Sequence, residues 1–339
     1  MTRYLPLLIT AAVFVLGYGI CAAQFPAFLS TRVVANLLTD NAFLGVVAVG
    51  MTLVIISGGI DLSVGSVIGF TTVFLALAID RWGVPPFLAF FLAFVIAGLF
   101  GAAMGGVIHA FDMPPFIVTL AGMFLARGAA FLLSTESIPI RSPAYDWITE
   151  TSFRLPGGGR LTIVAIIMLI VFIIGGVLLH FTRFGANIYA LGGSRVSTGL
   201  MGIRVGRNTV AIYACSGALA GLAGIVFSLY TSSGYSLSAV GIELDAIAAV
   251  VIGGTLLTGG YGFIAGAFLG VMMQGLIQTY INFDGSLSSW WTKIATGILL
   301  FLFIALQQAT LTISARATRR TSTARPAGSP IAGVARTAS

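Results

Sequence analysis

The chain has 339 residues, of which 58% are hydrophobic and only 8% are charged, and its formal net charge at pH 7 is +7. Because a soluble globular domain carries about a quarter charged residues, this composition excludes a water-soluble particle of this size. The basic residues stand at loop edges and in the C-terminal tail, as in the positive-inside pattern of membrane proteins, so the charge does not indicate nucleic-acid binding.

Long apolar stretches follow one another along the chain. A helix needs about 20 apolar residues to cross the hydrocarbon core of a bilayer, and the alternating strands of a membrane barrel are absent. Candidate helices occupy the windows Leu5–Ala23, Asn41–Ser57, Leu62–Ile79, Phe87–Ile108, Phe116–Leu133, Leu161–Leu179, Val210–Tyr230, Ala246–Leu257, Phe263–Ile281 and Trp290–Leu306. We therefore predict an all-α integral membrane protein in a lipid bilayer, a bundle of about ten transmembrane helices. Gly-rich breaks near 57–62 and 253–262 lower the number of full spans to between about eight and ten.

The first window and the small residues add detail to this bundle. The start of the chain resembles a signal peptide, but it lacks a clear cleavage site before a soluble region, so we interpret it as a retained helix. Cys21 and Cys215 lie in apolar windows and are interpreted as packing residues. Glycines four residues apart indicate close helix contacts; they are Gly101 and Gly105, Gly217 and Gly221, and Gly262, Gly266 and Gly270.

The arginines predict the orientation of the chain. Residues 183–207 carry arginines and no acid, and so does the C-terminal tail. If both face the cytoplasm, the number of spans is even and both termini are cytoplasmic. The longest outward loop is then 134–160, which mixes acids and arginines with proline and glycine turn signals. We predict a transmembrane domain over 1–310 and a disordered cytoplasmic tail over 311–339, because the tail lacks apolar periodicity.

The first constellation that points to function lies between the second and third windows. Here Gly58–Ser66 places Asp61 and Ser63 among glycines, in a break between two apolar helices. An aspartate at this depth is costly unless it faces protein or water, and broken helices free backbone groups for ligands. Two interpretations stay open: Asp61 caps or braces the next helix, or Asp61 and Ser63 line a substrate pathway.

The second constellation opens the short window near residue 246. Glu243 and Asp245 precede an apolar helix on the outward side, where acids are favoured by the helix dipole or belong to the substrate pathway. The glycine pair Gly253-Gly254 that follows echoes Gly58-Gly59. Corresponding breaks in two halves point to a transport site at the interface of a repeat. Transporter repeats are often inverted, whereas this helix count places both breaks on the same side of the membrane. Either the likeness is accidental or one helix is miscounted.

The third constellation is the cytoplasmic segment 181–208. Ser194 is a candidate cap for a short helix, and Arg195 follows it. Leu200 and Met201 then form an apolar knob before Gly202, suited to a groove on a partner protein. The alternative is an amphipathic loop that lies on the membrane surface.

Motifs of enzyme chemistry are missing from the sequence. The only lysine, Lys293, is preceded by threonine, so no phosphate-binding GxxxxGK[ST] loop exists. No HExxH motif or closely spaced set of cysteines and histidines predicts a metal site. We therefore expect neither an enzyme nor a cofactor in this chain.

Together the three constellations resemble the permeases of ribose-, arabinose- and galactose-type ABC sugar importers. The resemblance rests on the intact GGIDLSVGS motif at Gly58–Ser66, on Glu243–Thr255 followed by Gly259-Gly260, and on the cytoplasmic pattern from Thr182 to Ile203. It covers nearly the whole chain. Further stretches are similar to a galactofuranose-importer permease: Asn41–Gly45, Pro156–Leu161, Gln274–Gly285 and Leu287–Ala295.

This resemblance implies a bacterial inner-membrane permease that moves a monosaccharide but does not itself bind ATP. It implies that residues 194–202 form a coupling helix seated on a cytoplasmic ABC ATPase. A periplasmic sugar-binding protein would dock outside, and a second permease subunit, identical or different, would complete the pore. A stand-alone secondary carrier or channel is the alternative, which leaves the patterned cytoplasmic segment without a role.

Overall fold

The computed structural model of the chain describes residues 4–323. The first part of the chain contains α1 (Leu5–Gln24), η2 (Pro26–Leu29), α2 (Thr31–Asp40), α3 (Ala42–Ile56), α4 (Val64–Ala76), η3 (Leu77–Arg81), α5 (Pro86–Ala110) and α6 (Pro115–Leu133). A loop region follows, with β1 (Ile138–Pro139), α7 (Pro143–Glu150), β2 (Ser152–Arg154) and β3 (Arg160–Thr162). The remainder contains α8 (Ile163–Phe181), α9 (Arg183–Gly193), α10 (Arg195–Leu200), α11 (Val205–Thr231), β4 (Ser233–Gly234), α12 (Ile242–Ile252), α13 (Ile264–Asp284) and α14 (Trp290–Thr323).

The prediction of an all-α membrane bundle is confirmed. Between residues 4 and 323, 7 helices are long and apolar enough to cross a membrane, and the bent pair α2–α3 raises this number to 8. Each of the predicted windows holds a helix. However, α12 has 11 residues and is too short to cross a bilayer, which takes about 20. The apolar part of α14, Trp290–Leu306, is also short.

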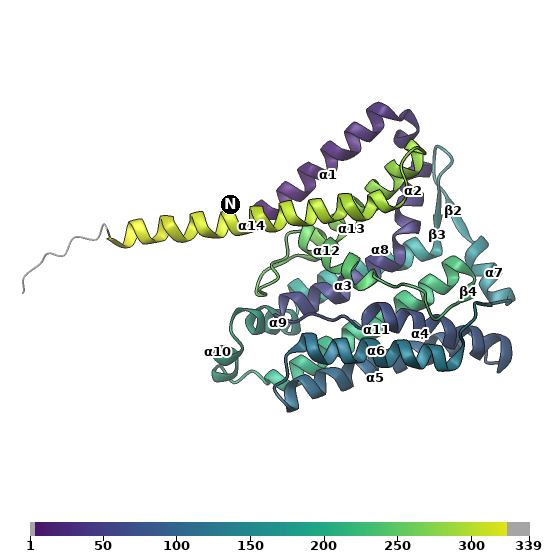
Figure 1. Cartoon of the computed structure of the whole chain (residues 1–339), viewed down its shortest axis with the longest axis horizontal. Helices are drawn as coiled ribbons and strands as arrows, with labels where there is room; N and C mark the ends of the chain where they lie inside the picture. The colour runs from purple at the N-terminus through teal and green to yellow at the C-terminus, as the bar shows by residue number, and fades with distance from the viewer. Residues whose placement is uncertain (1–3, 324–339) are drawn as a thin grey trace, which may run out of the picture.

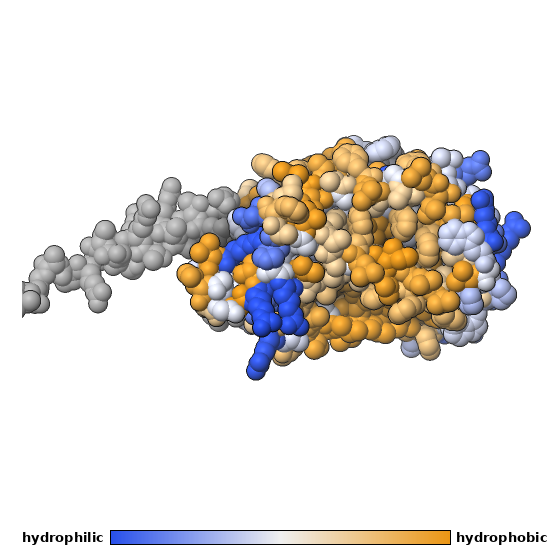
Figure 2. Space-filling model, turned by 90° about the horizontal axis from the view of Figure 1, so that it is seen from below, coloured by the Kyte–Doolittle hydropathy of each residue, from blue (hydrophilic) through white to orange (hydrophobic). Residues whose placement is uncertain are grey.

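Most of the long helices lie roughly along one direction, with α2 bent by 56° from α3, and the molecule has two distinct ends (Figure 1). One end holds the beginning of α1, the helices α9 and α10, and the far end of α14. The other end holds α7 and the β2–β3 hairpin. Figure 2 shows hydrophilic residues gathered at the two ends, with mostly hydrophobic surface between them. Such a band is the surface that lipid solvates.

Local signals explain where several helices begin. Proline occupies one of the first two positions of α1, α5, α6 and α7, where its missing N–H and fixed φ suit a helix start. The hydroxyl oxygens of Ser30, Thr162 and Thr182 cap α2, α8 and α9 by accepting N–H groups of the first turn. The local sequence therefore determines where these helices begin.

Helix α3 forms the centre of the bundle. Every residue of α3 except Phe43 is buried, and α8, α11, α12 and α13 contact it. The predicted small-residue contacts are confirmed for α5 and α11, where a β-carbon added at Gly101 would approach the α-carbon of Gly217 to 3.1 Å. Likewise, a β-carbon at Gly270 of α13 would overlap the backbone of Ala249 in α12. Only glycine permits these backbone approaches.

The predicted outward loop contains short elements. Strands β2 and β3 form an antiparallel hairpin in which Phe153 pairs with Leu161, and β1 pairs antiparallel with β4. At the other extreme of the chain, α14 continues to Thr323. Helical backbone therefore covers the beginning of the stretch predicted as a disordered tail, and residues 324–339 of that prediction lie outside the described residues.

Candidate functional site

The first Gly-rich break lies between α3 and α4. Gly58 has φ +86°, in the left-handed region that glycine enters without steric cost. The N–H groups of Gly58 and Gly59 return to the carbonyl oxygens of Ile55 and Val54 over 2.9 and 3.0 Å, which closes the last turn of α3. The chain then runs without helix until Val64.

Asp61 is fully buried in this break. Its Oδ1 accepts the N–H and the hydroxyl of Ser63 over 3.0 and 2.6 Å. Its Oδ2 accepts the hydroxyl of Ser216, from α11, over 2.7 Å. Protein donors therefore occupy both carboxylate oxygens, and they tie the break to α11. This geometry favours the bracing interpretation, while a pathway role for Asp61 and Ser63 stays a prediction.

The second break, between α12 and α13, repeats the backbone pattern of the first. The N–H groups of Gly254 and Thr255 return to the last turn of α12 over 2.9 and 3.2 Å, and Gly254 has φ +90°. Gly58 and Gly59 make the same pair of bonds at the end of α3. The equivalence is shifted by one residue from the sequence alignment, because Gly58 corresponds to Gly254 rather than to Gly253.

The two breaks meet each other and a glycine of α9. The N–H of Gly260 donates to the carbonyl oxygen of Ile56 over 2.8 Å. A β-carbon added at Gly192 of α9 would overlap that same oxygen and the amide nitrogen of Gly260. A β-carbon at Gly259 would lie 2.9 Å from the α-carbon of Gly58. Three chain segments, far apart in sequence, thus touch backbone to backbone.

Side chains also fix the α9–α10 segment to the bundle. The hydroxyl of Tyr189 donates to the carbonyl oxygen of Gly262 over 2.6 Å, so α9 is bonded to the second break. The prediction that Ser194 caps a short helix is confirmed, since its hydroxyl oxygen accepts the N–H of Ser197 over 3.2 Å at the start of α10. Helix α9 thus connects the short helix α10 to the second break.

The free side of α10 carries the predicted knob. Leu200 and Met201 are 85% and 67% exposed, and Gly202, with φ +79°, ends the segment. Arg195 lies 3.6 Å from the carboxylate of Asp112 in the turn between α5 and α6. Because these apolar side chains stand at a hydrophilic end of the molecule, they are available to a protein partner.

Glu243, in the first turn of α12, faces α4. A β-carbon added at Gly65 would overlap its carboxylate, and its buried Oε2 has no hydrogen-bond partner. Arg127 of α6 lies within electrostatic reach of Glu243. Its Nη1 donates to the carbonyl oxygens of Ser236 and Ser238, the latter over 2.9 Å. Arg127 thereby satisfies non-helical backbone that lies between membrane helices.

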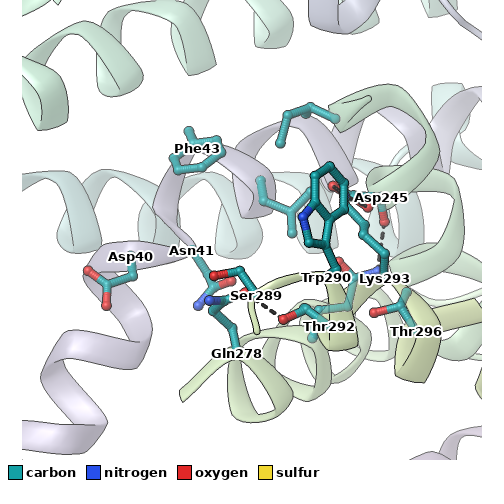
Figure 3. A pocket seen from close by; sticks show the side chains of 13 residues that line it. Asp40, Asn41, Phe43, Asp245, Gln278, Ser289, Trp290, Thr292, Lys293 and Thr296 are labelled. Carbon is teal, nitrogen blue, oxygen red and sulfur yellow. Dashed lines mark hydrogen bonds and ion pairs between the residues drawn. The ribbon is translucent and has the colours of Figure 1, made fainter. Parts of the chain in front are cut away.

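Asp245 faces the opposite side of α12 and opens onto a cavity. Lys293 of α14 donates to Oδ1 and Oδ2 of Asp245 over 2.7 and 2.5 Å. The cavity, of about 410 Å³, lies between this pair, the α2–α3 bend and α13. Figure 3 shows Trp290, Thr292 and Gln278 around the same space.

The predicted pathway residues therefore do not form one site. Asp61 and Ser63 belong to the first break, Glu243 faces α4, and Asp245 faces the cavity. Sequence reasoning missed Arg127, although it is the one ionisable side chain in the window Phe116–Leu133, and such residues mark function in membrane helices. No group of three or more potential metal ligands occurs among residues 4–323.

Comparisons with known proteins show the family. The family described as branched-chain amino acid transport system / permease component matches residues 33–304, and the chain belongs to it. The protein is therefore a multi-pass inner-membrane permease of an ABC transporter, a transport subunit rather than an enzyme. A permease subunit of this kind carries no cofactor of its own, and ATP is hydrolysed by its partner.

Several relatives extend over nearly the whole chain. The chain is 61% identical over 306 residues to the inner membrane ABC transporter permease protein YjfF of Escherichia coli K12, which covers 90% of this chain and 92% of that protein. It is 38% identical to the fructose import permease protein FruG of Bifidobacterium longum, over 92% and 93% of the two chains. It is also 38% identical to the ribose import permease protein RbsC of Bacillus subtilis, over 84% and 87%. No solved structure matches the chain.

Proposed function

We propose that this chain is the pore-forming permease subunit of an ABC importer for a monosaccharide, with galactofuranose as the specific candidate. The relatives that name a substrate are fructose and ribose import permeases. Three of the stretches that resemble a galactofuranose-importer permease, Asn41–Gly45, Gln274–Gly285 and Leu287–Ala295, contribute residues to the cavity beside Asp245.

The observation that carries this proposal is the link between α10 and the two breaks. An ABC importer permease works with an ATPase and a binding protein. Here the exposed knob of Leu200 and Met201, with Ser194, Arg195 and Gly202 around it, is the surface proposed to rest on the ATPase. Movement of that surface is passed through Gly192 to the carbonyl of Ile56 and to Gly260. The chain thus converts work done by a partner into movement of its broken helices.

The remaining partners follow from this arrangement. The α9–α10 end faces the cytoplasm, and both termini lie on that side. A periplasmic sugar-binding protein docks at the end that holds α7 and the β2–β3 hairpin. A second permease subunit, identical or different, completes the pore. The binding protein supplies affinity for the sugar, so the pathway needs only weak contacts, and alternating access depends on differential stabilisation of two states.

The test is to reconstitute the chain together with the proteins that copurify with it. The tagged chain is isolated in mild detergent, its partners are identified, and the complex is placed in liposomes with the binding protein. We expect a bound ABC ATPase and uptake of a monosaccharide that requires ATP. If the chain alone carries sugar on an ion gradient, with no ATPase bound, it is a secondary carrier and the proposal is wrong. Competition among galactofuranose, ribose, fructose and leucine then identifies the cargo.

A further inference from the structure

The cavity beside Asp245 lies between α2–α3, α12, α13 and α14, and it places polar side chains in a mostly apolar lining. Gln274 and Gln278 line it from α13, about 15 and 21 Å along a helix whose 21 residues span about 31 Å. On another side it is lined by Ile242 and Asp245 in the first turn of the short helix α12. Transporter sites lie near the bilayer midplane beside discontinuous helices of this kind.

Charge on this face indicates water rather than lipid. Lys293, in the first turn of α14, has a side chain 56% exposed, and α14 packs against α12 and α13. A half-exposed ammonium within a membrane helix is costly in hydrocarbon, and such groups face water-filled cavities or protein. Asp40, which is exposed at the end of α2, accepts a hydrogen bond from Tyr230 over 3.1 Å on the same side. These exposed charges suit a face that borders water.

The charges of the cavity suit a neutral ligand. Lys293 is the one cation that lines it, and both carboxylate oxygens of Asp245 already hold that ammonium. The pair takes two of the three N–H donors of this ammonium, so the carboxylate of an amino acid would have to share Lys293 with Asp245. An anionic ligand would meet Asp245 and Asp40 without a free cation. A neutral, polar ligand leaves the pair intact.

Hydrogen-bonding groups and one aromatic ring complete the lining. Asn41 uses its amide NH₂ on the carbonyl oxygen of Leu37, which leaves the carboxamide oxygen as an acceptor. Ser289 adds a hydroxyl, and the indole of Trp290, 78% exposed, stands beside it (Figure 3). A broad aromatic face next to amides and hydroxyls matches the ring and hydroxyl groups of a sugar, and 410 Å³ is within the range of small-molecule sites.

We propose that the cavity between the α2–α3 bend, α12, α13 and the start of α14 is a transient binding site for a neutral monosaccharide on the translocation pathway. Trp290 provides the stacking surface, while Asn41, Gln278 and Ser289 provide hydrogen bonds. The Asp245–Lys293 pair supplies polarity without net charge. This proposal rests on the proposed function and identifies the substrate class and the residues of its site.

The first test compares two adjacent tryptophans in the complete importer. Trp290 lines the cavity and Trp291 does not. We expect Trp290→Ala to lower sugar uptake about tenfold at equal assembly with the ATPase, and Trp291→Ala to stay within about twofold of the parent. Equal effects of the two variants would overturn the assignment.

The second test measures occupancy without transport. In the complete importer carrying Cys21→Ala and Cys215→Ala, Ser289→Cys is labelled with a charged, water-soluble thiosulfonate. Ala129→Cys, in an apolar cavity of about 190 Å³, is the matched control. We expect rapid labelling only at position 289, slowed by millimolar galactose, ribose or fructose and unaffected by leucine.

The outcomes separate the site from the function. An unlabelled Ser289→Cys, labelling that no sugar slows, or protection by leucine would each overturn the site. If the parent complex imports sugar and protection is absent, the proposed function stands and only the site is rejected. If the parent complex imports none of the sugars, both proposals fail.

Discussion

The N–H of Gly260, in the second break, donates to the carbonyl oxygen of Ile56 at the end of α3 over 2.8 Å, and this bond joins two breaks that lie about 200 residues apart. Gly192 of α9 packs against the same pair of groups. Helix α9, which directly precedes the α10 segment proposed to contact the ATPase, is therefore in backbone contact with both breaks. Four predictions follow from this contact and from the polar groups around it.

Gly192→Ala tests the contact itself. The added methyl group would overlap the carbonyl of Ile56 and the amide of Gly260. We expect a loss of about 1 to 3 kcal/mol in stability, seen as a lower melting temperature in detergent, together with reduced transport. Gly193→Ala is the control, because a β-carbon there meets nothing within 4 Å. If the two variants have the same melting temperature and the same transport rate, the close contact at Gly192 is not required for either.

Leu200→Arg tests the knob of α10. Leu200 is 85% exposed, so the substitution leaves the fold of the isolated chain unchanged. An unpaired charge in a protein interface weakens binding, and we expect recovery of the ATPase in copurification to fall about tenfold or more. Leu29→Arg introduces the same charge at a residue 74% exposed near the opposite end and should leave ATPase binding intact. Normal assembly and transport by Leu200→Arg would contradict the coupling role.

Asp61→Asn separates bracing from a pathway role. Ser63 and Ser216 donate to both carboxylate oxygens, so an asparagine NH₂ in place of Oδ2 loses one charge-assisted bond and requires the Ser216 hydroxyl to turn and accept. If Asp61 is a brace, the protein should lose about 1 to 3 kcal/mol of stability, and Ser216→Ala should lose less. Exposed Asp80→Asn is the control and should melt like the parent. A stable Asp61→Asn protein that no longer transports would instead support the pathway interpretation.

Arg127→Lys tests the support of the segment before α12. A lysine ammonium lacks the planar fork with which arginine reaches the carbonyl oxygens of Ser236 and Ser238. We expect a loss of about 1 to 3 kcal/mol and greater proteolysis of the segment 233–241. The exposed Arg81→Lys should change neither quantity. Unchanged protection of 233–241 in the Arg127 variant would show that the segment does not depend on this guanidinium.

Much of the fold is readable from local sequence. Apolar windows predict the helices because a helix in lipid needs a long apolar segment. Ser194 predicts the start of α10 because a capping side chain bonds to the first turn of its own helix. The glycine spacing in α5 and α11 predicts close helix contacts, and the structure shows that these two helices are partners. These signals involve residues within one or two helical turns of each other, so they can be recognised in the sequence.

What the sequence determined by itself is a membrane bundle with two glycine breaks, an exposed apolar segment and no nucleotide loop. Only the tertiary structure decided that Asp61 is held by Ser216 across 155 residues and that Glu243 faces α4 while Asp245 faces the cavity. It also decided that Gly192 touches both breaks. Such contacts depend on how whole helices pack. The residues next to each of these positions along the chain do not indicate which distant residue it will contact.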